Sequence, residues 1–355
     1  MNIITCEQVS NGHPDKICDQ IADAIVTDCL KHDPLSRVAI EVLVKDAHVI
    51  IAGELTSKHD PMYDLIVKDV FGRIGWDRLD YGTENNPTFE LTVLVNVQSP
   101  DIAQGVNVGG AGDQGMMYGY ATNETVEMLP IPFVLATELL RKLNIRHPQG
   151  LKADAKAQIS FDYDARRIQT FLCSVQHSPD LNQSDVRDIV EPMMHEIADY
   201  YYLNSDFNVL VNPTGRFVVG GSWGDCGVTG RKLACDTYGG VGHIGGGALS
   251  GKDPTKVDRS GAYATRKIAV DIVRNGFADK AEVQIAYAIG VAQPVSIHVE
   301  TFGTAKREQK FLDNYILQNY DLTPEGIISQ LDLKSFDYNV VSSYGHFGKV
   351  GLPWE

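Results

Sequence analysis

The chain has 355 residues, 46 acidic against 31 basic side chains, a net charge of -15, and 43% hydrophobic residues. It is long enough for two or three domains with real cores, which excludes a disordered chain. The acidic balance argues against nucleic-acid binding, because that function relies on broad basic surfaces.

The first hundred residues alternate helical and extended patterns. Apolar residues recur at helical spacing from Ile17 to Cys29, with Asp and Gln on the opposite side, which predicts an amphipathic helix. The patterns that follow predict strands at 37–44 and 48–55, a helix at 63–74 and a strand at 88–97.

The same order of elements returns twice. The second set is a helix at 132–143, a hairpin of 157–163 with 168–175, a helix at 184–202 and a strand at 207–211. The third set is a helix at 262–277, strands at 281–290 and 294–303, and helices near 309–320 and 323–331. Tight turns between the strands favour mainly antiparallel sheets. We therefore expect an α+β fold of three similar domains, at 1–100, 112–220 and 221–355.

Glycine-rich stretches near 105–120 and 213–251 are too long for simple turns and are expected to be functional connections. Residues 213–267 also carry eight Lys or Arg against four Asp, a local charge of +4 on an acidic protein. Glycine allows the backbone to approach a ligand closely. This pattern indicates a focused site for a small polyanion such as a nucleotide or polyphosphate.

The six cysteines show neither CxxC spacing nor a Cys/His zinc pattern, which favours free thiols in a reducing compartment and hence the cytoplasm. The amino-terminal residues lack the basic start and apolar core of a signal peptide. No run approaches the ~20 apolar residues of a membrane span, so neither secretion nor a membrane partner is expected.

Two nucleotide-binding fingerprints occur in the wrong context. Gly240-x-Gly242-x-x-Gly245 fits the dinucleotide pattern, but the residues after it cannot begin an apolar helix. Residues 246–252 resemble a P-loop until Asp253 replaces its Ser or Thr. Phosphate chemistry on another scaffold is the better interpretation.

His13, Asp15 and Lys16 lie at the start of the first predicted helix. Taken alone, these residues favour a plain helix start, with Asp15 as a favourable charge in the first turn, but together they also suit phosphate oxygens and Mg²⁺. Glu41 and Glu54 lie in predicted strands, where periodicity alone favours solvent-facing positions. No arrangement of nucleophile and base stands out, so an enzyme of this sequence relies on positioning and electrostatics.

Five collinear blocks, at 11–24, 110–125, 212–221, 224–232 and 245–260, closely resemble the S-adenosylmethionine synthetase (methionine adenosyltransferase) family. The resemblance runs from about residue 3 to the last residues. It implies three similar α+β domains in a pseudo-threefold arrangement, and a homodimer or dimer of dimers with shared active sites. It also implies a reaction in which the sulfur of L-methionine attacks ribose C5′ of ATP, and the released tripolyphosphate is hydrolysed to pyrophosphate and phosphate.

The resemblance assigns a role to each matching position. His13, Lys156, Arg231 and Lys252 correspond to catalytic residues. Two Mg²⁺ ions correspond to Asp15 and Asp258, and K⁺ to Glu41. The ATP-binding positions are His13, Asp113, Asp154, Lys156, Arg216, Phe217, Asp225, Arg231, Lys232, Ala248 and Lys252, and the methionine-binding positions are Glu54, Gln98, Asp225 and Lys256. Glu54, Gln98 and Asp113 are expected to come from the opposite subunit to most phosphate ligands.

Two departures from the family pattern stand out. The segment between Gln98 and the GAGDQG block is shorter than in relatives and lacks Arg and Lys, which predicts a weaker mobile lid. The chain also ends at PWE, where many relatives continue with a further helix. The alternative is a catalytically silent subunit that binds ATP or polyphosphate and regulates an active homologue, although every expected acid and cation position is filled.

Overall fold

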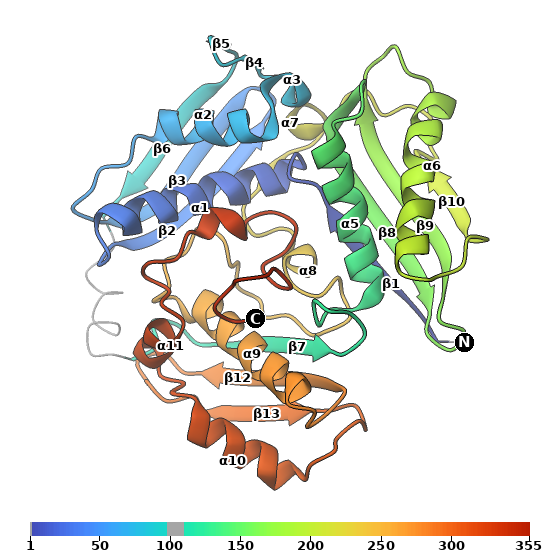
Figure 1. Cartoon of the computed structure of the whole chain (residues 1–355). Coiled ribbons are helices and arrows are strands. Elements are labelled where there is room, and N and C mark those ends of the chain that lie inside the picture. Colours follow the sequence, from blue (N-terminus) through green and yellow to red (C-terminus); the bar gives the residue numbers. More distant parts are fainter. Residues whose placement is uncertain (1, 98–109) are drawn as a thin grey trace.

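A computed structural model describes residues 2–97 and 110–355. Three sheets surround a centre at which helices α1 (Pro14–His32), α5 (Ile131–Arg146) and α9 (Val257–Arg274) gather (Figure 1). Helix α1 packs on strand β2 (Arg37–Lys45), α5 on β8 (Leu151–Asp162), and α9 on β7 (Gly115–Thr122). This arrangement confirms the expected α+β fold of three similar units, each a small sheet with helices.

The first sheet has the order β11-β2-β3-β6. It contains β2, β3 (His48–Thr56), β6 (Glu90–Asn96) and the two-residue β11 (Gly227–Val228). Strands β2 and β3 form an antiparallel hairpin, whereas β6 runs parallel to β3. Every second residue of β2 is buried, beginning at Val38, so one face of the sheet packs on α1 and the other stays open.

The second and third sheets also combine distant parts of the chain. The second has the order β1-β8-β9-β10, with β1 (Ile3–Val9), β9 (Arg167–His177) and β10 (Asn208–Val211) beside β8. The third has the order β13-β12-β7, with β12 (Lys280–Tyr287) and β13 (Ser296–Glu300). Only β3 with β6 and β9 with β10 pair in parallel among the described strands of these three sheets, so the sheets are mainly antiparallel.

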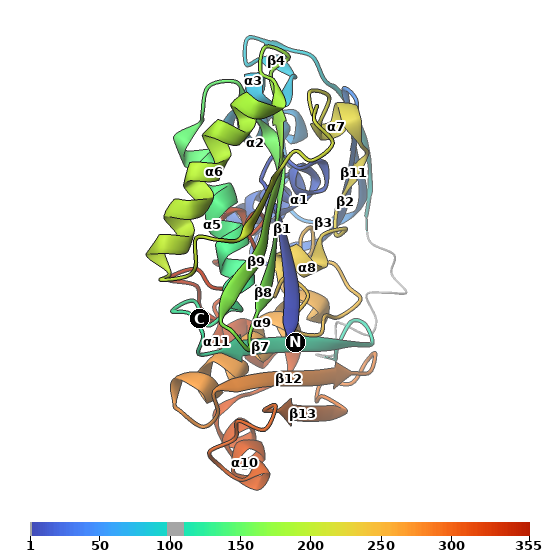
Figure 2. The ribbon, with the colours of Figure 1, turned by 90° about the vertical axis from the view of Figure 1, so that its right-hand side faces the viewer.

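The other elements connect or cover these sheets, and in Figure 2 helices α5 and α6 lie on one side of the second sheet. They are α2 (Tyr63–Ile74), α3 (Trp76–Leu79), β4 (Gly82–Thr83), β5 (Asn86–Pro87), α6 (Gln183–Tyr200), α7 (Gly221–Gly224), α8 (Leu233–Asp236), α10 (Gln309–Asn319), α11 (Pro324–Gln330) and a 3-10 turn at Tyr338–Val340. The helices and strands expected from periodicity are confirmed, with ends that move by a few residues.

Two of the longer strands, β1 and β7, are not predicted from the sequence, and neither are the two-residue strands β4, β5 and β11. No pattern predicts a strand at β1, and the interpretation of 105–120 as a glycine-rich connection is wrong for Gly115–Thr122. Gly119 shows why β7 contains glycine: an added Cβ would lie 2.0–2.3 Å from the backbone of Thr265 and Arg266 in α9. The glycine therefore permits close packing of a strand on a helix rather than a loop.

Helix α1 is not amphipathic in the expected sense, because both of its sides are buried. Asp15, Asp19 and Asp23 are each at most 1% exposed, as are Ile17 and Ile21 on the apolar side. The apolar side belongs to a core shared with the third sheet, while a second core lies between α5, α6 and the second sheet. Within the described ranges, none of the helices is both long and apolar enough to cross a membrane.

Candidate active site

The first group of candidate residues lies at the start of α1. His13 is the N-cap of this helix, and its Nδ1 accepts a hydrogen bond of 3.2 Å from the Asp15 N–H. The Asp15 carboxylate is buried; it accepts 2.6 Å and 2.9 Å hydrogen bonds from Lys232 Nζ and the Val228 N–H. The Arg231 Nε lies 3.7 Å from the same carboxylate. The buried Asp15 carboxylate therefore lies close to both Lys232 and Arg231, two of the expected phosphate-binding residues.

Strand β8 brings Asp154 and Lys156 to the same place. The Asp154 carboxylate accepts a 2.8 Å hydrogen bond from the Gly221 N–H, and burial raises the pKa of Asp154 to about 6 against the opposing effect of that bond. Burial, together with the Lys232 and Lys156 ammonium groups, lowers the pKa of His13 to about 3. His13 is therefore a neutral imidazole at physiological pH.

The tautomer of His13 follows from these contacts. Since Nδ1 accepts the Asp15 N–H and the ring is neutral, the single ring proton is placed on Nε2. The ring is 3% exposed and cannot turn freely. His13 therefore presents a fixed, uncharged hydrogen-bond donor next to Lys156 and Lys232.

The second group lies where β2 meets the start of α9. Lys252 Nζ forms a 2.7 Å ion pair with Asp258 in the first turn of α9, and the Lys252 backbone bridges to Ala39 of β2. Glu41 lies two residues further along β2. Partial burial raises the pKa of Glu41, and the nearby Lys252 charge opposes that rise.

Glu41 and Glu54 share the open face of the first sheet. Glu41 pairs with Ala52, and Glu54 pairs with Ala39, so the two residues occupy diagonal positions on the same face, with a backbone spacing of about 7–8 Å. Both side chains reach solvent, although neighbouring residues cover part of Glu41. Lys256, the residue before α9, forms an ion pair with buried Asp253.

The remaining candidates surround these two groups. The Phe217 N–H donates to His177 Nε2 over 3.0 Å, so the segment from Arg216 to Gly221 runs from β9 toward Asp154. Asp225 and Asp113 are exposed. Ala248 packs against Gly230, whose added Cβ would lie 2.5 Å from the Ala248 Cβ. Gln98 and the shortened segment after it lie outside the described residues.

The two groups contact β2 at different places. Strand β11, which precedes Arg231 and Lys232, pairs with Leu43 and Val44, whereas the Lys252 backbone bridges to Ala39. Because β11 runs antiparallel to β2, the residues that follow it lead back toward Ala39. The two groups are therefore distinguished by their ion pairs: Lys232 contacts Asp15 beside His13, whereas Lys252 contacts Asp258.

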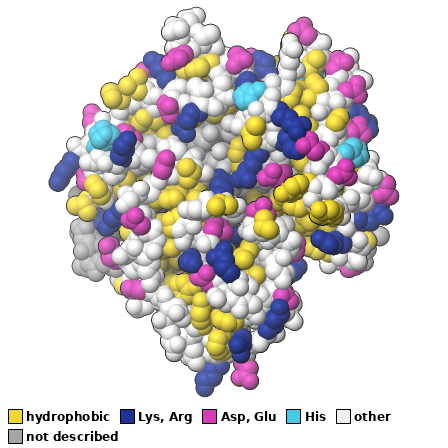
Figure 3. Space-filling model, in the orientation of Figure 1, with side chains coloured by type: hydrophobic (Ala, Val, Ile, Leu, Met, Phe, Trp, Pro, Cys, Tyr) yellow, Lys and Arg dark blue, Asp and Glu magenta, His cyan; other side chains and the backbone are white. Residues whose placement is uncertain are grey.

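One cavity and one surface view add to this description. A cavity of about 600 Å³ is lined by Arg141, Arg274, Lys349 and neighbouring residues, and none of the expected site residues lines it. A smaller cavity is lined by Asp258 together with Leu233 and Gly247. On the face that Figure 3 shows, Lys and Arg side chains are interspersed with Asp and Glu.

Comparison with known proteins decides the family. The S-adenosylmethionine synthetase N-terminal, central and C-terminal domains match residues 1–100, 108–217 and 219–355. The chain belongs to the S-adenosylmethionine synthetase family. An S-adenosylmethionine synthase of Mycoplasma mycoides is 45% identical over 99% of this chain and 94% of its own length. One of Clostridium tetani is 45% identical over 99% and 96%. The expected enzyme class, a transferase, is confirmed with the family.

The structure also shows two residues beside the candidate site, Asp19 and Asp23, that sequence reasoning missed. Three aspartates, spaced four residues apart on one side of α1, each accept a 2.9 Å hydrogen bond from a backbone N–H of the glycine-rich loops; Asp15, Asp19 and Asp23 bind Val228, Gly230 and Gly251, respectively. The spacing was visible in the sequence, but their partners lie more than 200 residues away. Helix α1 therefore positions the loops that carry Arg231 and Lys252.

Lys16 completes this buried polar layer. Its ammonium group forms ion pairs of 2.8 Å with Asp19 and 2.5 Å with Asp236, and all three side chains are at most 1% exposed. Burial raises the pKa of both carboxyl groups, and the Lys16 charge opposes that rise. Because a buried charge without a partner is costly, this triad fixes α8 beside the start of α1.

Proposed function

We propose that the protein makes S-adenosylmethionine from ATP and L-methionine. In this reaction the methionine sulfur attacks ribose C5′ and releases tripolyphosphate, which is hydrolysed to pyrophosphate and phosphate. The observation that carries the proposal is a repeated pairing: Asp15 with Lys232, and Asp258 with Lys252. Each pair offers one carboxylate for a metal ion and one ammonium for a phosphate.

The residues around His13 suit a step that needs charge neutralisation rather than a base. A thioether sulfur has no proton to lose, so the transition state requires alignment and stabilisation of the departing triphosphate. A neutral Nε2–H of His13 can donate to the leaving oxygen, and Lys156, Arg231 and Lys232 can bind the phosphates. Exposed Arg231 and Lys156 are free to turn toward a ligand.

The donor set fits the expected ions. Asp15 and Asp258 provide hard carboxylate oxygens, and Mg²⁺ commonly binds one or two carboxylates plus substrate phosphates. The ions, when bound, would neutralise charge on the triphosphate. Glu41 offers an oxygen for K⁺ on the open sheet face. In our proposal, Lys232 and Lys252 move from these carboxylates to the phosphates when ATP binds. Each ion pair is then replaced by one contact between the carboxylate and Mg²⁺ and one between the lysine and a phosphate.

Methionine and the nucleoside require the other candidates. Glu54 and Asp225 supply carboxylates for the substrate ammonium and the developing sulfonium, with Gln98 and Lys256 beside them. Asp113, Asp154, Arg216, Phe217 and Ala248 are proposed to surround the nucleotide. Each group has its own pair of acid and cation, Asp15 with Lys232 and Asp258 with Lys252, and we propose that one group from each of two chains forms a complete site.

A homodimer, or a dimer of dimers, would bring the groups together. Leu94 of β6 pairs with Ala52 on the open face of the first sheet and is 59% exposed, and Met116 of β7 is 55% exposed. Exposed apolar side chains of this size are compatible with a protein interface. Free cysteines, five of them buried, support a reducing location such as the cytoplasm.

The test is incubation with ATP, L-methionine, Mg²⁺ and K⁺, with S-adenosylmethionine detected by mass and phosphate by a colorimetric assay. We expect product only when both substrates and Mg²⁺ are present. A protein that binds ATP but makes no S-adenosylmethionine at high concentration and saturating substrates would instead be the silent regulatory subunit.

A further inference from the structure

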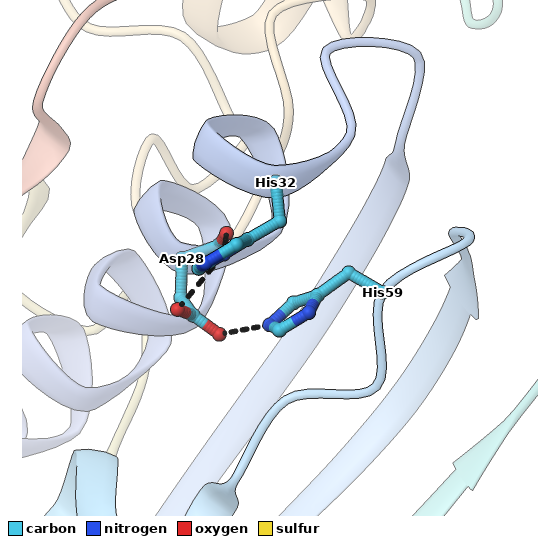
Figure 4. Close-up of side chains that lie close together, drawn as sticks. All are labelled: Asp28, His32 and His59. Atoms are coloured by element: carbon cyan, nitrogen blue, oxygen red, sulfur yellow. Dashed lines mark hydrogen bonds and ion pairs between the residues drawn. The ribbon is translucent and has the colours of Figure 1, made fainter.

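A cluster of two imidazoles and one carboxylate lies at the far end of α1 from His13. Asp28 and His32 are one helical turn apart on α1, and His59 comes from the segment after β3 (Figure 4). His59 Nε2 lies 2.7 Å from one Asp28 oxygen, and His32 Nδ1 lies 3.4 Å from the other. The imidazole rings stack with centroids 4.1 Å apart.

The backbone around the cluster is held in place by polar contacts. The hydroxyls of Ser36 and Ser57 are hydrogen-bonded over 2.7 Å, and the Lys58 N–H donates to the Asp33 carboxylate over 2.9 Å. The His59 N–H donates to Ser57 Oγ over 3.0 Å. The segment that carries His59 is thus fixed to the end of α1 before any ligand binds, which reduces the entropy cost of binding.

We infer that Asp28, His32 and His59 bind one divalent transition-metal ion of the Zn²⁺ type, with water in the fourth position. Three ligand atoms, one from each residue, lie within 4.8 Å of one another. Within the described part of the chain, no other group of three such residues comes so close. Two imidazoles and a carboxylate are a typical ligand set for Zn²⁺ and related ions, whereas Mg²⁺ prefers oxygen ligands alone.

The distances are close to those of a tetrahedral site, but the two contacts use different Asp28 oxygens. The two rings must also turn out of their stack, because an imidazole nitrogen binds a metal in the plane of its ring. Two ligand atoms on a tetrahedral Zn²⁺ lie about 3.3 Å apart, from bond lengths of about 2.0–2.2 Å. The 3.4 Å contact between His32 and Asp28 already matches this spacing. The 2.7 Å contact of His59 with Asp28 must lengthen by about 0.6 Å to admit the ion.

Binding also exchanges hydrogen bonds for metal bonds. His32 Nδ1 lies 2.9 Å from the Asp28 carbonyl oxygen, and this contact is given up when Nδ1 binds the ion and the ring proton moves to Nε2. The proton between His59 Nε2 and Asp28 is likewise replaced by the ion. The side chains of Asp28 and His59 are 27% and 23% exposed, so an ion can enter from solvent.

The ion would join two parts of the first unit. It would connect the last turns of α1 to the segment between β3, which carries Glu54, and α2. Because the ion binds the folded arrangement and finds no such site in the unfolded chain, its binding free energy adds to the stability of the fold. This inference concerns metal binding and does not depend on the proposed catalytic activity.

The first experiment is Co²⁺ titration of the purified metal-free protein in excess Mg²⁺, followed by visible absorption. We expect one Co²⁺ per chain with the intense bands of a tetrahedral site, and its displacement by Zn²⁺. His59→Ala should weaken binding by more than about tenfold and remove the bands, because it deletes a direct ligand. The control is His195→Ala: His195 and Glu191 are also four residues apart on a helix, with nitrogen and oxygen 3.8 Å apart.

The second experiment measures thermal unfolding with and without Zn²⁺. Zn²⁺ should raise the Tm of the wild type and of His195→Ala, and leave that of His59→Ala unchanged. A folded His59→Ala protein that binds Co²⁺ with the affinity and spectrum of the wild type would overturn the inference. So would a wild type whose Co²⁺ spectrum is octahedral and abolished by Mg²⁺. Neither readout requires product formation, so failure here is distinct from failure of the proposed function.

Discussion

Asp23 of α1 and Arg259 of α9 form a two-pronged ion pair in which both side chains are fully buried. Arg259 Nη1 and Nη2 lie 2.7 Å and 2.8 Å from the two oxygens of Asp23. The same pair holds the neighbouring loop: Asp23 accepts from the Gly251 N–H, and Arg259 donates to the Lys252 carbonyl oxygen, each over 2.9 Å. The backbone at Lys252 is therefore positioned from two helices at once.

Asp23→Asn should be strongly destabilising. The substitution keeps the shape of the side chain but leaves the Arg259 charge buried without its partner, which typically costs about 3–5 kcal/mol. Urea unfolding measures the loss. Asp64→Asn is the control, since Asp64 pairs with Lys68 on an exposed face of α2 and its loss should cost about 0.5 kcal/mol or less. Equal effects of the two variants would contradict the role of the buried pair.

This layer of buried acids also marks the limit of sequence reasoning. The regular spacing of Asp15, Asp19 and Asp23 is visible in the sequence, and it predicts the polar side of an amphipathic helix. Their partners are backbone N–H groups of loops beyond residue 227, and no local pattern reports such a contact. The spacing of apolar residues predicts the helix, but it does not show which distant segments pack on its polar side.

The two longer strands that the sequence does not predict, β1 and β7, have a similar cause. Strand β1 joins a sheet made by residues 151–211, and β7 joins one made by residues 280–300. Helices and hairpins depend on neighbouring residues and were predicted, whereas these pairings depend on distant ones. The candidate site residues came from the family resemblance, since spacing alone left Glu41 and Glu54 as edge positions and His13 as a helix start.

Mixed dimers should recover activity when the two variants lie in different groups. Arg231→Ala disables the group at the start of α1, and Lys252→Ala disables the group on β2; each alone should lower the rate by roughly 10²–10³. In a mixed dimer one of the two shared sites is complete, so random exchange should restore about a quarter of wild-type activity. The assay is S-adenosylmethionine formation after denaturation and refolding of the mixture.

The matched control mixes Arg231→Ala with Lys232→Ala. These residues are adjacent and belong to the same group, so every site in a mixed dimer lacks one of them and no recovery is expected. Recovery in both mixtures, or none in the first despite subunit exchange proven by mass spectrometry, would argue against a site shared between chains.

His13 should make stability depend on pH. Its folded-state pKa of about 3 lies below the ordinary value of 6.5, so between these values the unfolded chain binds a proton that the folded chain does not. Stability must therefore fall as the pH drops from 6.5 toward 3. His13→Asn, which keeps an N-cap acceptor, should show a weaker fall over the same range. Chemical unfolding at several pH values measures both; identical slopes would refute the assigned pKa.

Gly247→Ala should weaken Mg²⁺-dependent activity by displacing Asp258. A Cβ at Gly247 would lie 2.1–2.4 Å from the Asp258 carboxylate, closer than atoms can approach, so that side chain must move away from Lys252. Gly246→Ala is a matched control on the neighbouring residue, because its Cβ would meet no atom within 4 Å.

The rate of S-adenosylmethionine formation as a function of Mg²⁺ concentration distinguishes the two variants. Gly247→Ala should require several-fold more Mg²⁺ than the wild type, since a carboxylate ligand is out of position, and Gly246→Ala should not. If both variants kept the wild-type Mg²⁺ dependence, Asp258 could not be a metal ligand of the reaction.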